Sequence, residues 1–351
     1  MKSNIRYSLL PVLLCAATAG RSQDTASYAD PKYIVADNMV IYQHADGGWP
    51  KHIADRNIDY TVWLNKKQQS SARKDAATAG DATIDNNATT REIRFLLKAY
   101  NSTHNQVYLA AAENGIRYLY RAQYSNGGWP QFYPDRSLYR AEITFNDNAM
   151  INVLNLLLDL KLGINDLGVV SNELRSKAGD AIDRGINIIL KTQLTWKGKP
   201  AVWCQQYDET RLTPAKARAY ELPAFTAGES VGIITFLMRL KNPSPEIKAA
   251  INNAVAWLEA TKINGYKFVD VPDASAGGGK NKILVKDPAS VIWARYYDLD
   301  TNEPFFCGRD GIKKKSVMEI EPERRNGYAW YGNWAEKLIT KDYPEWVTAN
   351  K

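Results

Sequence analysis

Apolar residues recur at helical spacing through most of the chain. The segment 93–100 places them at i, i+3, i+4 and i+7, which is the buried face of an amphipathic helix. The segments 151–160 and 231–240 are apolar on nearly every side, as expected of helices that are buried all round. Strand-like alternation is scarce, and only short pieces such as 201–204 and 282–285 have the composition to pair locally. The pattern therefore predicts an all-α fold of consecutive helices.

One short motif is repeated along the chain. The segment 43–50 ends in Gly-Gly-Trp-Pro, and the segment 123–130 has the same ending 80 residues later. A degenerate third copy begins at Gln193 and runs through Trp196 to Trp203. Each copy follows a predicted helix, and the glycine pair permits backbone angles that other residues avoid. Repetition of such a unit indicates helical hairpins that close into a ring.

A polar step follows each copy and opens the next helix. These steps are Thr-Ile-Asp-Asn at 83–86 and Phe-Asn-Asp-Asn at 145–148, and we expect Arg-Ala-Tyr-Glu at 218–221 to take the same place in the third copy. Asp and Asn before a helix also cap its free N–H groups, so Asp85 and Asp147 have a purely structural interpretation as well. Because the copies are in phase, the steps should gather at one end of the ring, where a functional site would lie.

The chain begins with the features of a secretory signal peptide. Two basic residues precede an apolar run over 9–17, and a small-x-small cleavage site ends at Ala19. The run is too short to span a bilayer. We therefore predict a signal peptide over 1–19 and a single domain over 20–351, since no linker divides the remainder.

The signal segment lacks the sequence of a lipid anchor. Cys15 is preceded by Leu14, where a lipoprotein signal requires a small residue. No later stretch has the length and composition of a membrane span. These features predict a secreted or periplasmic protein without a membrane anchor.

The formal net charge of +7 favours an anionic partner. A polyuronate, a nucleic acid or a membrane surface would each satisfy it, and an ordinary charged surface explains the charge alone equally well. Nucleic acid is the least favoured of these partners, because no basic helix with interleaved aromatic residues and no known nucleic-acid module is present.

Cysteine and histidine do not form a recognisable site. After removal of the signal peptide Cys204 and Cys307 remain, and neither belongs to a metal-binding pattern. An oxidising compartment would allow them to pair, and the sequence leaves this open. The chain has 3 histidines, none beside an obvious serine or cysteine nucleophile, so a hydrolytic triad is not supported.

Five motifs in the right order resemble signatures of the polysaccharide lyase family 10 pectate lyases. They lie within residues 42–334, at 83–90, 126–131, 143–150, 217–222 and 307–311. The resemblance implies an (α/α)3 toroid, a barrel of repeated helical hairpins joined by long loops and short irregular strands. It also implies an enzyme that cleaves polygalacturonate in pectin by β-elimination, assisted by Ca2+. We expect the protein to act as a monomer.

The same resemblance implies a role for each candidate site residue. Arg218 resembles the family's catalytic base, and Asp85 is the second catalytic candidate. Asp85 and Asp147 resemble acids that hold the calcium ion. The basic residue that assists Arg218 is left open between Lys199 and Lys216. The substrate-binding candidates are two arginines that resemble residues gripping uronate carboxylates, and two neighbouring asparagines: Arg295, Arg309, Asn86 and Asn148.

The chemistry of elimination explains why such residues are needed. The C5 proton of a uronate is α to a carboxylate, which barely stabilises the negative charge left when that proton departs. A divalent cation and guanidinium groups neutralise this carboxylate, and Ca2+ prefers the oxygen ligands that aspartates and uronates supply. An arginine base is unusual because the arginine pKa lies above about 12, so burial and nearby positive charge must lower it.

Three other interpretations stay open at this point. Arg218 has a simple ion-pair partner in Glu221, three residues on. A non-catalytic protein that binds acidic polysaccharide would show affinity without creating new chain ends. An inverting glycoside hydrolase on an α/α toroid would use two carboxylates, for which the candidates are Glu92, Glu142, Asp147, Glu221 and Glu229.

Overall fold

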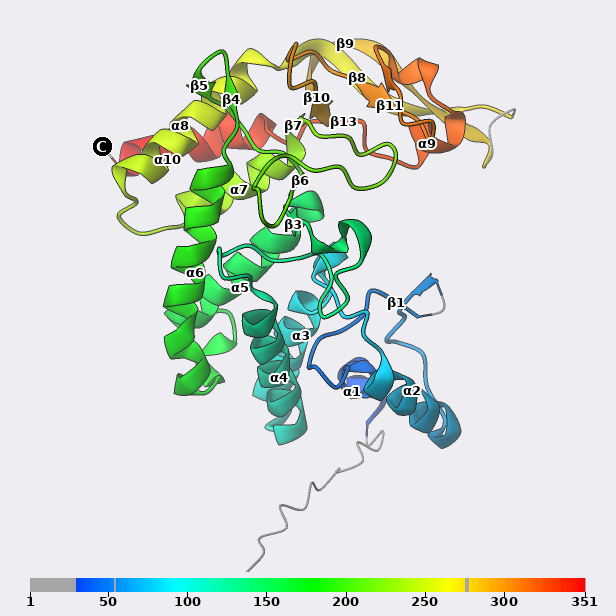
Figure 1. Ribbon diagram of the computed structural model, residues 1–351. Helices are drawn as coiled ribbons and strands as arrows, with labels where there is room; N and C mark the ends of the chain where they lie inside the picture. The colour runs from blue at the N-terminus through cyan, green and yellow to red at the C-terminus, as the bar shows by residue number, and fades with distance from the viewer. Residues whose placement is uncertain (1–29, 54, 275–277, 351) are drawn as a thin grey trace, which may run out of the picture.

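Helical hairpins follow one another through the chain, and strands from its C-terminal part cover one end of them (Figure 1). The computed structural model describes residues 30–53, 55–274 and 278–350. None of the described helices has the length and apolar character of a membrane span. The predicted signal peptide at 1–19 lies outside the described residues and stays a prediction.

Three helical hairpins form the body of the fold, and another pair of helices precedes them. The hairpins are α3 (Thr90–Thr103) with α4 (Gln106–Ala122), α5 (Ala149–Leu162) with α6 (Asn172–Thr192), and α7 (Gly228–Met238) with α8 (Pro245–Ala260). The preceding pair is α1 (Ile34–Tyr42) with α2 (Lys66–Thr78). This arrangement confirms the predicted (α/α)3 toroid.

Shorter helical segments lie between and after the hairpins. They are η1 (Pro31–Tyr33), η2 (Asp85–Asn87), η3 (Leu138–Ala141), η4 (Asn146–Asn148), η5 (Leu167–Val169), η6 (Val317–Glu319), α9 (Pro322–Asn326), η7 (Leu338–Asp342) and α10 (Tyr343–Ala349). Two of them, η2 and η4, coincide with the first two polar steps, so each step is itself a tight turn that leads into a hairpin.

Local sequence explains where several helices begin and end. The Asn65 side chain accepts a hydrogen bond from Gln68 N, and the Gln68 side chain accepts one from Asn65 N, which is a capping box at the start of α2. Ser244 caps α8, and Pro245 takes its first position, where a missing N–H leaves no bond unmade. Helix α5 ends at Gly163, whose φ of 65° is a left-handed value that glycine adopts readily.

Helix α5 lies in the centre of the core. Leu154, Leu156 and Leu157 have no exposed surface, which confirms the prediction of a helix buried on nearly every side. Gly185 of α6 permits close packing here, because a Cβ at this position would lie 2.6 Å from Leu154 Cδ2. Burial of each leucine stabilises the fold by about 1.5–3 kcal/mol, so this hairpin supports those on either side of it.

One glutamine holds the loop of each repeat. At the end of α1, the Gln43 amide donates to Gly47 O and to Ala111 O, both at 2.8 Å. Gln123 and Gln193 make the same two bonds, one to their own loop and one to the second helix of the following hairpin. Each glutamine therefore ties its loop to the next hairpin, and the repeat predicted from the sequence is confirmed.

A buried tryptophan anchors each loop on the helix before it. The indole N–H of Trp49 donates to the carbonyl of Met39 in α1 at 2.7 Å. Trp129 and Trp203 make the same bond to α4 and α6, at 2.8 and 2.7 Å. All three indoles are fully buried, so they serve packing, as large rings in a core usually do.

The chain contains a fourth turn of this kind that was not predicted from the sequence. Trp293 donates its indole N–H to Leu258 O in α8 at 2.8 Å. The segments 203–214 and 293–304 share the pattern Trp-x3-Tyr-Asp-x5-Pro, and in both the tyrosine is buried with its hydroxyl bonded to a backbone carbonyl. This turn lacks both the Gly-Gly pair and the proline after tryptophan that mark the first two turns in the sequence.

Short antiparallel strand pairs link the turns. They are β1 (His52–Ile53) with β2 (Arg56–Asn57), β3 (Ile143–Thr144) with β6 (Gln206–Tyr207), β4 (Thr195–Trp196) with β5 (Lys199–Pro200), β7 (Phe225–Thr226) with β10 (Tyr296–Tyr297), and β11 (Phe306–Cys307) with β12 (Lys313–Lys314). The pairs β3–β6 and β7–β10 each join a polar step to the turn that follows it in the chain.

One ribbon is longer than the short irregular strands that were predicted. It consists of β8 (Ile263–Pro272) and β9 (Lys280–Ala294), and β13 (Tyr331–Gly332) pairs with β9. Most of its side chains are partly or fully exposed on both faces. A strand without a buried face does not alternate apolar with polar residues along its length. The sequence therefore indicated only the piece 282–285 of β9, which pairs with residues 267–270 of β8.

Aromatic residues from the C-terminal part form a second, smaller core. Its buried members include Tyr220, Tyr296 and Trp330, and Tyr328 packs against them. The segment 328–334 contributes Tyr328, Trp330 and Tyr331 to this core. The core also places Tyr296 and Tyr328 beside the loop that carries Arg218, because Tyr220 belongs to that loop.

Cys204 and Cys307 are free and buried. Cys204 Sγ lies 3.1 Å from Gln205 Oε1, and Cys307 Sγ lies 3.8 Å from Ala219 O. The question that the sequence left open is therefore answered, and they do not pair.

Candidate active site

Backbone hydrogen bonds join each polar step to the next tryptophan turn. Three such bonds run from step to turn: Ile84 N to Gln131 O at 3.2 Å, Phe145 N to Gln205 O at 2.9 Å, and Ala227 N to Arg295 O at 3.3 Å. Each accepting residue stands two positions after a tryptophan. We call the four residues at this position the turn row: Lys51, Gln131, Gln205 and Arg295. The steps and the turn row lie together at one end of the hairpins, as the in-phase repeat predicts.

The third step begins at Thr226, and the prediction that it lies at 218–221 is wrong. In the first two copies a threonine N–H donates to the carbonyl of the preceding loop's tryptophan, at 3.0 Å for Thr83 and 3.2 Å for Thr144. Thr226 makes this bond to the third tryptophan at 2.9 Å. The segment 218–221 belongs instead to the long loop between β6 and β7. The acidic residue of the third step is therefore Glu229, in the first turn of α7.

Asp85 and Asp147 occupy different positions within their steps. Asn86 and Asp147 both have a φ of 49°, and an asparagine with positive φ follows each of them. Asn and Asp tolerate this left-handed conformation better than most residues. Asp85 is therefore the counterpart of Asn146, one residue earlier than the alignment of the two aspartates predicts. The consequence is a difference in exposure, because the Asp85 side chain is 4% exposed and that of Asp147 is 41% exposed.

Two neighbouring cavities form a polar cleft at this end of the fold. The first, of about 80 Å³, is lined by residues that include Lys51, Asp85, Asn86, Asp147, Arg218 and Glu221. The second, of about 110 Å³, is lined by Asp147, Asn148, Gly228, Glu229, Arg295 and Trp334. Asp147 lines both, so the cavities are two parts of one cleft. All the predicted site residues except Arg309 line it.

Lys51 is a site residue that was missed in the sequence. Its ammonium group forms an ion pair with Asp85 Oδ2, while Asp85 Oδ1 is buried and has no hydrogen-bond partner. Lys51 directly follows the first Trp-Pro, and Gln131 takes the same place 80 residues later. The repeat offset was therefore the signal that would have identified both residues as part of the cleft.

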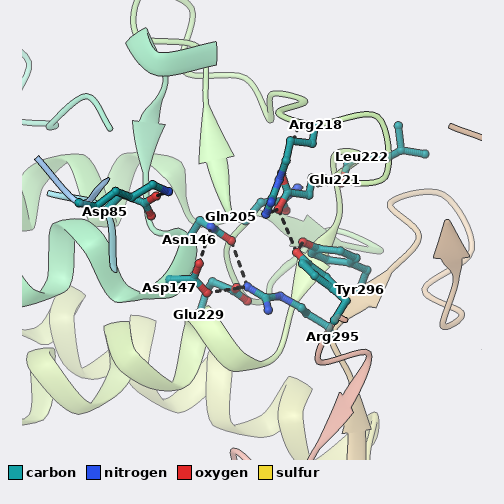
Figure 2. A network of polar contacts seen from close by, with 12 residues as sticks. Asp85, Asn146, Asp147, Gln205, Arg218, Glu221, Leu222, Glu229, Arg295 and Tyr296 are labelled. Atoms are coloured by element: carbon teal, nitrogen blue, oxygen red, sulfur yellow. Dashed lines mark hydrogen bonds and ion pairs between the residues drawn. The ribbon is translucent and has the colours of Figure 1, made fainter. Parts of the chain in front are cut away.

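Arg295 is held by carboxylates at the other end of the cleft. Its Nη2 lies 2.6 Å from Glu229 Oε1 and 3.1 Å from Asp147 Oδ1 (Figure 2). Burial alone would lower the pKa of Arg295, but Glu229 and the neighbouring tyrosines and Asp147 together outweigh it and raise this pKa well above its usual value. Burial raises the pKa of Glu229 against the opposing effect of Arg295. The guanidinium therefore stays charged where it lines the cleft.

Glu229 entered the sequence analysis only as a candidate for a hydrolase. Its Oε2 is buried and has no hydrogen-bond partner, so the carboxylate is directed at Arg295 through one oxygen alone. An alignment of the steps on their threonines, rather than on their aspartates, would have placed Glu229 at the site.

Arg218 is paired with Glu221, as its spacing in the sequence allowed. Nε and Nη2 of Arg218 donate to the two Glu221 oxygens at 2.8 and 2.5 Å (Figure 2). These hydrogen bonds raise the pKa of Arg218 above its usual value, which is opposite to the shift that a base requires. Burial would raise the pKa of Glu221, but Arg218 outweighs it and the pKa is lowered. The Arg218 side chain is 45% exposed, so a ligand in the cleft can reach it.

The remaining basic candidates lie outside the cleft. Arg309 is 64% exposed, and its guanidinium pairs with Glu323 at 3.0 and 3.1 Å. Lys199 and Lys216 are exposed and line neither cavity. The lysine that the structure places beside the predicted acids is Lys51 instead.

The oxygens of the cleft suit a hard cation such as Ca2+, although they do not complete its shell. Over residues 30–53, 55–274 and 278–350, no group of three or more His, Cys, Asp or Glu is placed to hold a metal ion. Unpartnered buried oxygens are present on both Asp85 and Glu229. Because Ca2+ takes about 6–8 oxygen ligands, an ion bound here would need further oxygens from a ligand.

The arrangement is suited to binding and neutralising an anionic ligand. Lys51, Arg218 and Arg295 bring three cationic groups to the cleft. Guanidinium groups bind carboxylates through charge-assisted hydrogen bonds, and fixed charges of this kind stabilise negative charge that develops during a reaction.

Comparisons with known proteins give one family match and similar solved structures. Residues 43–339 match the family described as pectic acid lyase. The chain is 35% identical to a family 10 polysaccharide lyase from Cellvibrio cellulosa, covering 90% of this chain and 91% of that chain with a TM-score of 0.77. An aspartate-to-alanine mutant of a lyase of that family and organism, in complex with trigalacturonic acid, gives 35% identity, 89% and 91% coverage and a TM-score of 0.76. A comparison with curated proteins finds no match.

Proposed function

Because the chain belongs to the pectic acid lyase family and is a pectate lyase, we propose that it cleaves polygalacturonate by β-elimination, with Arg218 as the base. The observation that carries this proposal is that Arg218 and Arg295 line one cleft with Asp147, which belongs to both of its parts (Figure 2). A chain of uronates carries one carboxylate per sugar, and a cleft with several fixed cations attracts such a polymer.

The proposed reaction breaks the C5–H and C4–O bonds of a galacturonate unit and forms a C4–C5 double bond. Arg218 accepts the C5 proton, and the departing oxygen takes a proton from solvent. Arg295 binds the carboxylate attached to C5 and stabilises the negative charge that develops on it. Because Glu229 and Asp147 hold its guanidinium, Arg295 is already oriented when the substrate arrives.

Arg218 acts as a base only after it has lost its own proton. Its pairing with Glu221 opposes this loss, whereas the partial burial of the guanidinium favours the neutral form. A polymer lying over the cleft would bury Arg218 further and so act in the same direction. The base role therefore depends on the closed, substrate-bound cleft.

We further propose that Ca2+ assists the reaction. Asp85 and Asp147 would hold the ion, and uronate oxygens would complete its shell. Bound there, Ca2+ would neutralise the substrate carboxylate and so favour loss of the adjacent proton. Since Lys51 already pairs with one oxygen of Asp85, the unpartnered Oδ1 is the oxygen left for a cation.

The remaining candidates take supporting roles in this proposal. Asn86 and Asn148 line the cleft and would bind substrate hydroxyl groups. Arg309, which lies outside it, would bind a uronate further along the polymer. The predicted signal peptide supports a place of action in the periplasm or the medium, and the net charge of +7 supports an anionic partner.

Ultraviolet absorbance tests the proposal, since elimination produces an absorbing unsaturated uronate and hydrolysis does not. The mature protein would be mixed with polygalacturonate, first with Ca2+ and then with a chelator. We expect absorbance to rise with Ca2+ and to stop rising when the chelator is added. A rise that the chelator does not affect would refute the calcium role alone. New reducing ends without absorbance would indicate an inverting hydrolase, and binding without new ends a non-catalytic protein.

A further inference from the structure

Tyr328 lies between the two arginines of the cleft and contacts the environment of both. Its hydroxyl donates to Glu221 Oε1 at 3.0 Å, and Glu221 is the partner of Arg218. The centre of its ring lies 4.7 Å from the guanidinium carbon of Arg295. Tyr328 thus meets Arg218 through a hydrogen bond and Arg295 through a cation–π contact.

The hydrogen bonds of the Tyr328 hydroxyl have fixed directions. Glu221 is 3% exposed on its side chain and accepts from the Arg218 backbone N at 3.1 Å as well as from its guanidinium. The Tyr328 hydroxyl has one proton, which it donates to Glu221. The Tyr296 hydroxyl, 2.5 Å away, must therefore donate to the Tyr328 oxygen. The direction of each bond from Tyr296 to Glu221 is therefore fixed, and Glu221 has little freedom to turn away.

The ring side of the link is equally constrained. Arg295 has the Tyr328 ring on one side and the carboxylates of Glu229 and Asp147 at its Nη2. The Tyr328 ring itself packs against Trp330, with centroids 4.9 Å apart, and against Tyr220, with centroids 5.5 Å apart. The aromatic core therefore fixes the surface on which Arg295 rests.

From these contacts we propose that Tyr328 is a positioning residue for both arginines. Its hydroxyl orients Arg218 by way of Glu221, and its ring orients Arg295. The inference rests on the proposed function, in which Arg218 removes the proton and Arg295 binds the carboxylate. It assigns a separate kinetic effect to each half of one side chain, which a residue that only stabilises the fold would not show.

Two variants separate the two halves. Tyr328→Phe keeps the ring and removes the hydroxyl, so we expect kcat to fall roughly 10- to 100-fold, as for a lost hydrogen bond to a charged group, with KM unchanged within about twofold. Tyr328→Leu removes both halves, so we expect the same fall in kcat and in addition a rise in KM of roughly 5- to 30-fold, from the lost cation–π contact. Both constants are measured with polygalacturonate by the absorbance of the unsaturated product.

Tyr297→Phe is the matched control. Tyr297 is also buried and bonds its hydroxyl to a backbone carbonyl, Thr261 O at 2.9 Å, but it lines neither part of the cleft. We expect this variant to keep wild-type kcat and KM, whatever its melting temperature. A Tyr328→Phe variant with wild-type kcat, or one that matches Tyr297→Phe in every constant, would overturn the inference. Failure of the proposed function itself would appear differently, as a wild-type protein that forms no unsaturated product.

Discussion

The first and last members of the turn row differ from the two between them. Lys51 and Arg295 are cations in separate parts of the cleft, whereas Gln131 and Gln205 are neutral. The backbone around all four is alike, because each follows a buried, hydrogen-bonded tryptophan by two positions. The comparison shows that one set of residues builds the turns and another set supplies the charge.

This division makes stability and chemistry separable by mutation. The glutamines and tryptophans of the repeat bond to backbone groups and do not line the cleft, so changing them should alter stability alone. Lys51, Gln131 and Arg295 of the turn row, and Arg218 of the nearby loop, line the cleft, so changing them should alter activity first. Each prediction below changes one set and measures both properties.

The largest effect on activity is expected from Arg218, which belongs to the loop after the third turn. Arg218→Ala removes the proposed base, and a general base typically contributes about 10²- to 10⁴-fold to the rate. We therefore expect kcat for polygalacturonate to fall by at least about 100-fold. The free energy of unfolding should fall as well, because the substitution leaves the Glu221 carboxylate, whose side chain is 3% exposed, without its cation.

Arg211→Ala is the control for that variant. Arg211 lies in the same loop and pairs with Asp208 at 2.8 and 3.2 Å, but it is 76% exposed and does not line the cleft. Its loss should leave kcat unchanged. If Arg218→Ala retained more than about a tenth of the wild-type turnover, its role as base would be refuted.

The next largest effect is expected when the fourth turn is given the residue of the third. Arg295→Gln puts into this position the amide that Gln205 provides in the preceding turn. Loss of the carboxylate contact should lower kcat/KM by about 100-fold, the scale of one lost oxyanion-stabilising donor. It also leaves Glu229 buried without its cation, which should lower the free energy of unfolding by about 3–5 kcal/mol.

A double variant distinguishes those two consequences. Arg295→Gln with Glu229→Gln removes the unpaired charge, so the free energy of unfolding, measured by denaturant titration, should recover by at least about half. Activity should stay low, because the cation is still missing. Recovery of both properties would mean that Arg295 serves the fold and not the substrate.

Much of the fold was predictable because its helices are buried and its repeats are marked by rare residues. Helix α5 is recognisable in the sequence because leucines occupy nearly all of its faces, which is typical of a fully buried helix. The paired glycines and tryptophans locate the first two turns to the residue. The fourth turn retains only tryptophan, tyrosine, aspartate and proline at fixed spacing, and the exposed ribbon β8–β9 has no buried face to impose alternation.

The sequence predicted which residues line the site better than it predicted how they are arranged there. Six predicted residues line the cleft. The sequence-based prediction, however, paired Asp85 with Asp147, which differ by one position in the structure, and it did not include Lys51. Both errors have the same origin. The aspartates are the most prominent residues of the steps in the sequence. The steps are structurally equivalent, however, through the backbone hydrogen bonds of Thr83 and Thr144. Pairing across the chain, such as that of Lys51 with Asp85, depends on contacts that no local pattern specifies.

A smaller effect is expected when the first turn is given the residue of the second. Lys51→Gln puts into this position the amide that Gln131 provides 80 residues later, and it removes a cation from the cleft while leaving the turn intact. We expect KM for polygalacturonate to rise about tenfold, corresponding to about 1.4 kcal/mol of binding free energy. The melting temperature should fall, because Asp85, whose side chain is 4% exposed, loses its cation. The reciprocal variant Gln131→Lys should not raise KM. An unchanged KM in Lys51→Gln would show that the two positions are equivalent in function as well as in backbone.

The smallest effect on activity is expected from the residues that build the turns. Gln123→Ala removes the two hydrogen bonds that the amide donates, to Gly127 O at 3.0 Å and to Ala181 O at 2.9 Å, and the one that its oxygen accepts from Arg184. Each carbonyl left without its partner carries a cost, so the free energy of unfolding should fall by about 1–3 kcal/mol. Because the amide touches no residue of the cleft, kcat and KM of the folded variant should equal those of the wild type at a temperature where both are folded.

Gln106→Ala is the matched control for Gln123→Ala. Gln106 is an exposed glutamine at the start of α4, and its two hydrogen bonds are both long, at 3.5 Å. Its removal should cost less than about 0.5 kcal/mol, as most surface substitutions do. A Gln123→Ala variant with full stability would show that the hairpins are joined by apolar packing alone. A variant with normal stability but lowered kcat would show instead that the turns and the cleft are coupled. The residues that build the turns would then also affect the reaction.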